Sequence, residues 1–222
     1  MKNLHNALRL KQLYQLRNLG YRYASITPYS PPQEAPLHDA KDLTTLAQHL
    51  HMCHLCTLSK SRQRVLIGEG KSRSDILFVG EIANKKEEEE GKIFIGRSGE
   101  MLTHMIEKVL GIPRKEVYLT HLLKCHPPET SKIEDSMMQT CSSYLLQEIK
   151  LVQPKIVVTL GQLSYRYLTQ DATPLQEIRG RTIRMKDYQL VPTYHPNFLL
   201  KNPSRKQEVF EDLKMIKSLL SS

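Results

Sequence analysis

The chain has 222 residues, of which 40% are hydrophobic and 25% charged. These values suit one globular domain plus an extension and exclude wholesale disorder. Lys and Arg outnumber Asp and Glu by 32 to 23, giving a net charge of +9. A charge of this sign fits either a polyanionic partner or a merely solubilising surface. No run of about 18 apolar residues occurs, so we expect no membrane span.

The first part of the chain differs in composition from the rest. Residues 1–20 place leucines at helical spacing among basic residues, with no apolar stretch of the kind that a secretory signal needs. Four prolines between residues 27 and 36 then indicate a linker. We therefore predict a basic helical extension and Pro-rich linker over residues 1–45 and one domain over 46–222. The extension either contacts phosphates or packs on the domain, and we expect the protein to be cytoplasmic.

Beyond the linker the pattern alternates between strands and helices. Short apolar runs at 76–80 and 156–161 are typical of strands covered on both faces, and 117–120 and 190–191 are weaker candidates. The helical segments between and after them are 99–110, 136–152, 162–168 and 205–220. This alternation predicts a three-layer α/β/α domain with a central, mainly parallel sheet.

Three loops are expected to carry the chemistry. Ligands of open α/β sheets bind beyond the carboxyl ends of the strands. The segments that follow the strand candidates are 80–99, 121–128 and 193–203, and all are rich in Gly, Pro, His or charged residues.

The cysteines form a second signal. The chain has four, a C-x₂-C pair at Cys53 and Cys56 and two singles at Cys125 and Cys141. Reduced thiols at such spacing favour one four-thiolate metal site over disulfides. The residues alone allow either zinc or an iron–sulfur cluster.

The loops and cysteines together resemble the iron–sulfur, or family 4, uracil-DNA glycosylases. The resemblance runs from about Cys53 to Leu213. Its matching pieces are C-x₂-CTL at 53–58, IGEG at 67–70, FVGE at 78–81, GKIFIGRSG at 91–99, VYLTHLLKCHPP at 117–128, PKIVVTLG at 154–161, IRG at 178–180 and TYHP at 193–196, which runs into LLKNP. Their order and spacing carry the resemblance.

The resemblance implies an enzyme with the uracil-DNA glycosylase fold. Its reaction is hydrolysis of the bond between uracil and deoxyribose in DNA, without lyase activity, which leaves an abasic site. The target nucleotide must be flipped out of the duplex. The implied cofactor is a 4Fe–4S cluster on Cys53, Cys56, Cys125 and Cys141, which ties three segments together, and the implied partner is DNA containing uracil or another deaminated base. We expect a monomer.

Three catalytic residues follow from the resemblance. His195 matches the histidine that donates to the developing oxyanion on uracil O2, for which a neutral imidazole suffices. Glu81 lies in the first motif. Glu87, with Glu88, falls on the family's acidic pair, and two interpretations remain open: one of them orders the attacking water, or the run 87–90 is a solvated acidic surface.

The expected substrate contacts lie in the same loops. Phe94 matches the aromatic on which the flipped base stacks, although a core Phe in a strand with Ile93 and Ile95 is an alternative. Gly80 and Ile82 are expected to line the pocket, as is Asn197. The family's first motif reads GEAPG, and here residues 82–84 depart from it, which changes the loop's backbone preferences.

His121 is the largest departure from the family pattern. The family has an asparagine here, whose planar amide offers a donor and an acceptor to one base edge, whereas one imidazole normally satisfies only one such contact. We therefore expect altered base preference or reduced activity. Two alternatives follow: a glycosylase for hypoxanthine or xanthine, and a catalytically weak protein that binds damaged or single-stranded DNA. Nucleophilic catalysis by His121 is disfavoured, because the basic insertion of a covalent DNA-trapping relative is missing.

Contacts with the DNA backbone are assigned to basic residues near the expected mouth. These are Lys124, Arg179 and Lys201, and Leu200 is expected in the loop that probes the minor groove. Such phosphate contacts supply affinity without sequence preference.

Overall fold

The structure is a computed structural model that describes residues 40–129 and 132–221. The helix expected over residues 1–20 and the Pro-rich linker lie outside these ranges. Within them, no helix combines the length and the apolar character that crossing a membrane requires.

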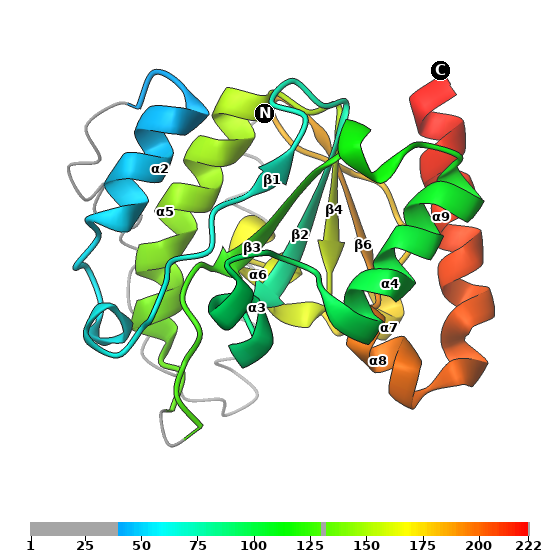
Figure 1. The fold of residues 1–222 in the computed structure, drawn as a ribbon. Coiled ribbons are helices and arrows are strands. Elements are labelled where there is room, and N and C mark those ends of the chain that lie inside the picture. The colour runs from blue at the N-terminus through cyan, green and yellow to red at the C-terminus, as the bar shows by residue number, and fades with distance from the viewer. Residues whose placement is uncertain (1–39, 130–131, 222) are drawn as a thin grey trace, which may run out of the picture. The chain divides into compact units, whose positions relative to one another are not determined.

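A six-stranded sheet forms the centre of the domain, in the order β1-β3-β2-β4-β6-β5 (Figure 1). The four central strands run parallel, and a short antiparallel strand closes each edge. The mainly parallel sheet predicted from the sequence is confirmed. The strands are β1 (Glu69–Gly70), β2 (Ile76–Ile82), β3 (Tyr118–Leu123), β4 (Ile156–Leu160), β5 (Ile183–Arg184) and β6 (Gln189–Thr193).

Helices cover both faces of the sheet, which gives the predicted three layers (Figure 1). One face carries α2 (Leu43–His51), α5 (Asp135–Val152) and α6 (Gln162–Thr169). The other carries α4 (Gly96–His104), which continues as the π-helical turn η2 (Met105–Leu110), together with α8 (Pro196–Lys201) and α9 (Lys206–Ser221). The remaining short helices are η1 (Thr57–Lys60), α3 (Lys85–Glu90), η3 (Arg114–Glu116), α7 (Leu175–Ile178) and η4 (Pro203–Arg205).

The domain begins ahead of residue 46. Asp42 caps α2 by accepting a hydrogen bond from the Thr45 backbone N–H at 2.7 Å. Leu46 and Leu50 of this helix are buried, and α2 packs against α5. Residues 43–45 therefore belong to the folded domain rather than to the linker.

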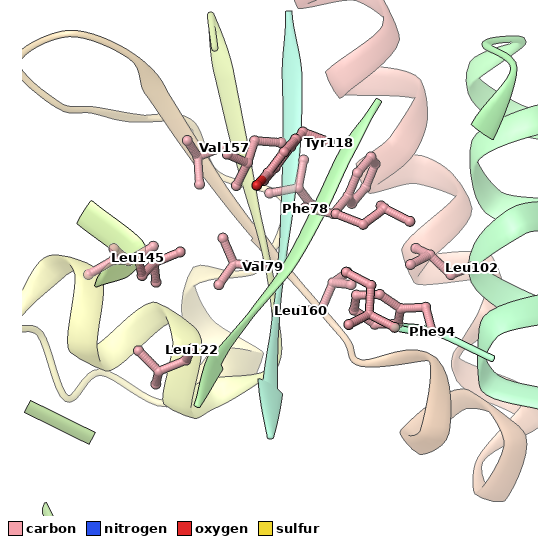
Figure 2. Close-up of a cluster of buried hydrophobic side chains, with 14 of the residues drawn as sticks. Phe78, Val79, Phe94, Leu102, Tyr118, Leu122, Leu145, Val157 and Leu160 are labelled. Carbon is pink, nitrogen blue, oxygen red and sulfur yellow. The ribbon is translucent and has the colours of Figure 1, made fainter. Parts of the chain in front are cut away.

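The core lies on both faces of the central strands (Figure 2). Every residue of β3 and β4 is buried, as is every residue of β2 up to Gly80. Continuous apolar runs form strands here because both of their faces are covered by helices. Fully burying one Val, Leu or Phe side chain contributes about 1.5–3 kcal/mol, so these strands form a rigid platform for the loops at their carboxyl ends.

Strand register brings the site residues together. β2 and β3 are parallel neighbours, and Gly80 pairs with His121 across them. Both strands end within a few residues of this pair. The loops after β2 and β3 therefore leave the sheet side by side, as the sequence predicts.

Candidate active site

A pocket of about 320 Å³ opens at the carboxyl end of the sheet. It is lined by residues from the end of β2, by the residue that caps α8 and by α8 itself, namely Glu81, Ile82, His195, Asn197, Phe198 and Lys201. Five of these six were predicted as site residues from the sequence. Phe198 was not; it stacks on Tyr194 with a centroid separation of 4.7 Å.

His195 is held in a defined tautomer. It precedes α8, and its Nδ1 accepts a hydrogen bond from the Asn197 backbone N–H at 3.1 Å. A neutral imidazole that accepts at Nδ1 carries its proton on Nε2. Burial, followed by the neighbouring His121, lowers the pKa of His195 to about 4. At neutral pH the pocket therefore contains an uncharged N–H donor at Nε2.

The Glu81 carboxylate packs directly against Gly161, which leaves room for it because it has no side chain. Its Oε1 accepts a hydrogen bond from the Leu163 backbone N–H at 2.8 Å, at the start of α6. A Cβ on Gly161 would lie 2.4 Å from that oxygen, and Gly161 has a φ of +107°. Only glycine combines this backbone with this close approach. Burial raises the pKa of the Glu81 carboxyl, against the lowering effect of the Leu163 amide.

Glu87 is a buried residue that hydrogen-bonds to several segments, and not a solvated surface residue. It lies in α3, where Asn84 and Glu87 form a reciprocal capping box. Glu87 and Glu88 are only 2% and 5% exposed. The interpretation of 87–90 as a wholly solvated run is therefore wrong for its first two residues.

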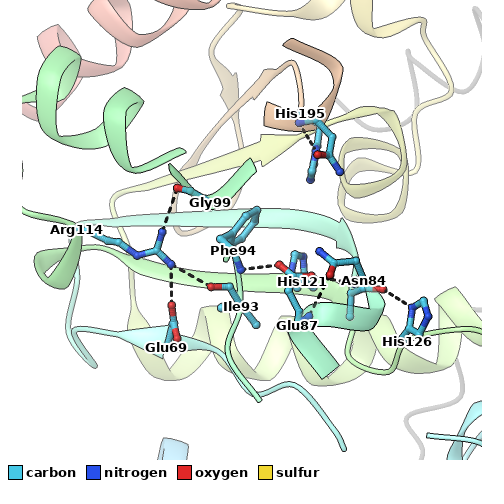
Figure 3. Close-up of polar contacts among 12 residues, drawn as sticks. Glu69, Asn84, Glu87, Ile93, Phe94, Gly99, Arg114, His121, His126 and His195 are labelled. Carbon is cyan, nitrogen blue, oxygen red and sulfur yellow. Dashed lines mark hydrogen bonds and ion pairs between the residues drawn. The ribbon is translucent and has the colours of Figure 1, made fainter. Parts of the chain in front are cut away.

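Both carboxylate oxygens of Glu87 are engaged within the chain (Figure 3). Oε2 accepts from the Asn84 N–H at 2.8 Å, and Oε1 accepts from the Phe94 N–H at 2.6 Å and lies 3.3 Å from His121 Nε2. Burial alone would raise the pKa of Glu87, but His121 and the two backbone donors bring it below its usual value. The carboxylate thus joins a helix cap, a loop and a strand.

Phe94 lies in a bend and not in a strand, so the expected alternation with Ile93 and Ile95 is wrong. The expectation of a core Phe is confirmed, because the side chain is 2% exposed and packs in the hydrophobic core. Its φ of +50° is left-handed, which costs a non-glycine residue about 1–2 kcal/mol. Arg114 fastens the turn by donating to the Ile93 carbonyl at 3.0 Å and pairing with Glu69 at 2.8 Å (Figure 3).

The Phe94 ring is buried between the two site histidines. Its centroid lies 4.6 Å from that of His121 and 6.2 Å from that of His195. The three rings therefore form one group at the carboxyl end of the sheet.

His121 is buried on β3 and has one open atom. The side chain is 2% exposed, and Nε2 faces Glu87. Nδ1 has no hydrogen-bond partner among the described residues. A Cβ on Gly80 would lie 2.3 Å from Nδ1 and 2.7 Å from the Phe94 ring. The absence of a side chain at Gly80 is what allows both rings to sit here.

The four cysteines converge on a second, small cavity at the other side of β3. Cys53, Cys56, Cys125 and Cys141 all line it, among apolar side chains. Arg62 donates to Cys125 Sγ at 3.6 Å, and the Lys124 backbone N–H donates to Cys141 Sγ at 3.4 Å. Within residues 40–129 and 132–221, no three Cys, His, Asp or Glu are arranged as a ready site for a metal ion.

Comparisons with known proteins agree with this architecture. The family model described as the Uracil DNA glycosylase superfamily matches residues 67–214. The chain belongs to this superfamily. It is 36% identical to the Type-4 uracil-DNA glycosylase of Saccharolobus solfataricus over 82% of this chain and 88% of that protein. The corresponding protein of Sulfurisphaera tokodaii is 34% identical over 80% and 84%, and that of Thermotoga maritima 30% identical over 79% and 93%.

Two basic residues of this superfamily member do not lie where the sequence predicted. Lys124 is 1% exposed, and its ammonium pairs with Glu148 and Thr120 inside the domain. The prediction that Lys124 contacts DNA phosphates is wrong, because the group is buried and neutralised. Arg179 pairs with Asp212 at 2.6 Å and with Glu208, so its guanidinium is likewise committed to contacts within the domain.

The segment around α8 keeps its predicted position. Lys201 is exposed at the rim of the pocket, and Leu200 beside it is partly buried. Their contact with DNA stays a prediction. Two residues that organise the site were missed: Asn84, which the Asn-x-x-Glu capping signature could have revealed, and Arg114, for which the sequence holds no such signal.

Proposed function

We propose that this chain is a DNA-repair glycosylase that hydrolyses the N-glycosidic bond of uracil in DNA and leaves an abasic site. Membership of the superfamily and its similarity to Type-4 uracil-DNA glycosylases support the reaction class. The observation that carries the proposal is His195, a neutral imidazole whose Nε2–H is available in the pocket that Glu81 also lines.

The chemistry follows from where charge develops. As the bond between the sugar carbon and the base nitrogen breaks, the sugar becomes positive and uracil gains negative charge on its oxygens. Nε2–H of His195 donates a hydrogen bond to uracil O2, where that charge accumulates. One well-placed donor of this kind is worth about 10²–10³ in rate.

Glu81 complements His195 on the sugar side. Its carboxylate stabilises the positive sugar and orients the water whose oxygen adds to the sugar carbon. Because one oxygen is fixed by the Leu163 N–H, the carboxylate enters the reaction already oriented. Glu87 is not assigned this role, since both of its oxygens bind groups of the chain.

DNA binding is assigned to the rim of the pocket. Lys201 there is exposed and forms no ion pair with the residues that the structure describes, and it contacts phosphate, while Leu200 enters the space that the flipped base leaves. The net charge of +9 supports a polyanionic partner. We also propose a monomer acting in the cytoplasm, where thiols stay reduced.

We propose that the four cysteines hold a 4Fe–4S cluster. All four thiols line one cavity, and two N–H groups donate to the sulfurs, as is usual for thiolate ligands. Burial raises the pKa of the Cys141 thiol to about 12, so metal binding must displace its proton. The bound cluster would act as a structural link between the segment after α2, the end of β3 and the start of α5. Visible absorption with iron and sulfide analysis, lost in Cys141→Ser, tests this.

The activity is tested with oligonucleotides that carry uracil opposite G, opposite A or in a single strand, followed by alkaline cleavage of abasic sites. Wild type is expected to cleave at uracil, and His195→Ala to lose about 10²–10³ in single-turnover rate. His104→Ala is the matched control, because His104 is exposed and lies outside this pocket. Binding without any product from all three substrates would favour the weakly catalytic DNA-binding alternative instead.

A further inference from the structure

A groove of about 390 Å³ lies between α4 with its continuation η2 and the C-terminal helix α9, on one face of the sheet (Figure 1). Within the described chain it shares none of its lining residues with the active-site pocket. Its volume falls within the range of about 300–1,000 Å³ that is typical of ligand pockets. We call it the α4–α9 groove, and the residues that line it include Met101, Met105, Lys108, Lys206, Phe210 and Leu213.

Helical spacing gives the groove an apolar floor. Met101, Met105 and Val109 follow one another at intervals of four residues along α4 and η2, so they share one face. Val209 and Leu213 have the same spacing on α9, and both are buried. Methionine side chains are flexible and adapt to partners of different shape. The floor can therefore accept apolar side chains from another molecule.

One wall of the groove is an unusual piece of helix. η2 is a π-helical turn, and such turns are rare and are found frequently at functional sites. It contributes Met105, Lys108 and Val109 to the groove. None of these three residues lines the active-site pocket, so the proposed glycosylase chemistry does not account for the irregular helix.

Phe210 presents an aromatic ring at the edge of this floor. Its side chain is 38% exposed, although the large apolar side chains of the domain are mostly buried. The Lys214 ammonium lies 4.4 Å from the centre of the ring and covers one side of it. An exposed aromatic ring beside a concave apolar surface is typical of the residues that anchor a protein–protein interface.

The charges that border the groove have one sign. Lys108 and Lys206 are exposed, and of the described residues no acidic one lines the groove. Neither lysine has an ion-pair partner within residues 40–129 and 132–221. The nearby Glu211 of α9 already accepts hydrogen bonds from Gln207 and Lys214. Electrostatic complementarity therefore favours a partner that carries carboxylates.

A peptide suits this surface better than a nucleic acid does. Phosphates would pair with the two lysines but would leave the apolar floor uncovered. Bases bind to proteins by stacking on aromatic faces, and Phe210 is the one aromatic side chain among the described residues that line the groove. Aliphatic and thioether groups instead match the apolar side chains of a peptide.

We propose that the α4–α9 groove binds an acidic peptide segment of a partner protein. Apolar side chains of the segment lie on the floor and against Phe210, and its carboxylates pair with Lys108 and Lys206. Apolar anchors that enter a groove between helices are a common mode of peptide recognition. The inference goes beyond the proposed glycosylase activity and does not depend on it. Because the groove is separate from the active-site pocket, DNA and the peptide can be bound together.

Selection from a library of random twelve-residue peptides displayed on phage tests the proposal without presuming a sequence. The immobilised full chain is expected to enrich peptides that combine Asp or Glu with Leu, Ile or Phe. The double variant Lys206→Glu, Phe210→Ser is expected not to enrich them. If wild type enriches no peptide over this variant, or enriches basic peptides, the proposal is overturned.

The affinity of the most enriched peptide then locates the site. Measured by fluorescence anisotropy, it should fall about tenfold or more in Phe210→Ser, as for a central aromatic anchor. It should also fall in Lys206→Glu, by a factor that shrinks at high salt. Leu146→Ser and Lys150→Glu are the matched controls, since both residues are exposed on α5, which covers the other face of the sheet. Equal losses in the controls overturn the proposal.

Two further measurements separate the other occupants. Binding of a single-stranded oligonucleotide should be unchanged in Phe210→Ser and should not compete with the peptide. If Phe210→Ser weakens oligonucleotide binding, the groove is a nucleic-acid surface and the proposal fails. Sedimentation velocity should show no dimer that Phe210→Ser abolishes; such a dimer would mean that a second copy of the chain covers the groove, which also overturns the proposal.

Discussion

Two buried carboxylates flank β3 and differ in how completely their surroundings are satisfied. On the side of α5, Glu148 accepts from Thr120 at 2.7 Å and from the Gly68 N–H at 3.2 Å, and it pairs with Lys124. On the opposite side, Glu87 holds Asn84, Phe94 and His121. We call these the Glu148 cluster and the Glu87 cluster. Among the described residues, the Glu148 cluster contains no buried side-chain polar atom that lacks a hydrogen-bond partner. In the Glu87 cluster, His121 Nδ1 lacks one.

The alternation of a strand explains how one segment serves both clusters. Successive side chains of β3 point to opposite faces, so Thr120 joins Glu148 while His121 joins Glu87. A fully satisfied buried network rigidifies the structure, whereas an unpaired buried polar atom such as His121 Nδ1 has a free-energy cost. The two faces of β3 therefore differ in that one carries a fully hydrogen-bonded polar cluster and the other does not.

The largest expected effect breaks the closed cluster. Lys124→Met leaves Glu148 buried without its cation, which should lower the free energy of unfolding by about 3–5 kcal/mol. Denaturant unfolding measures this. Lys150→Met, an exposed lysine on the same helix as Glu148, should change it by less than about 0.5 kcal/mol. A small change in the free energy of unfolding of Lys124→Met would mean that Lys124 and Glu148 do not form a buried ion pair in solution.

The next effect concerns the open cluster and should appear in catalysis. Phe94→Leu removes the aromatic face while keeping an apolar side chain of similar reach. Loss of base stacking is worth about 1–3 kcal/mol. The single-turnover rate of uracil excision should therefore fall by the factor that corresponds to this free energy. A variant that excises uracil at the wild-type rate would show that Phe94 is only a packing residue.

The last expected effect is a dependence of stability on pH. His195 has a pKa near 6.5 in the unfolded chain and about 4 in the folded domain. Between these values the unfolded chain binds a proton that the folded one does not, so stability falls as the pH drops from about 6.5 to about 4. Above that window the contribution is fully present.

Thermal unfolding at several pH values checks this dependence. His195→Asn lacks the titrating group and should show a flatter profile across the same window. The donor stays neutral throughout, so excision should not require protonation of His195 between about pH 8 and pH 5. A wild-type profile that is already flat would contradict the lowered pKa.

The sheet could be predicted because its strands are short, continuous apolar runs. Ile76–Ile82 and Ile156–Leu160 were recognised in this way, within two residues of their ends. The helix α3 was missed, because a run of four glutamates resembles a solvated loop and nothing in the run itself shows that Glu87 turns inward. The two-residue strands at the edges are too short to leave a pattern.

The residues of the site were predicted from its motifs, whereas the ion-pair partners of its basic residues were not. Glu81, Ile82, His195 and Asn197 line one pocket as expected. Lys124 was misplaced because its partner, Glu148, is 24 residues away along the chain, and sequence alone does not reveal which acid neutralises which base. The same holds for Arg179 and Asp212, which are 33 residues apart.

The short strands at the two edges of the sheet affect the tendency of the protein to aggregate. A free strand edge is a template on which other chains can pair and aggregate. Here β1 and β5 offer only two residues each, and they carry Glu69 and Arg184 at those edges. Crowded copies of the domain therefore find little edge backbone on which to polymerise.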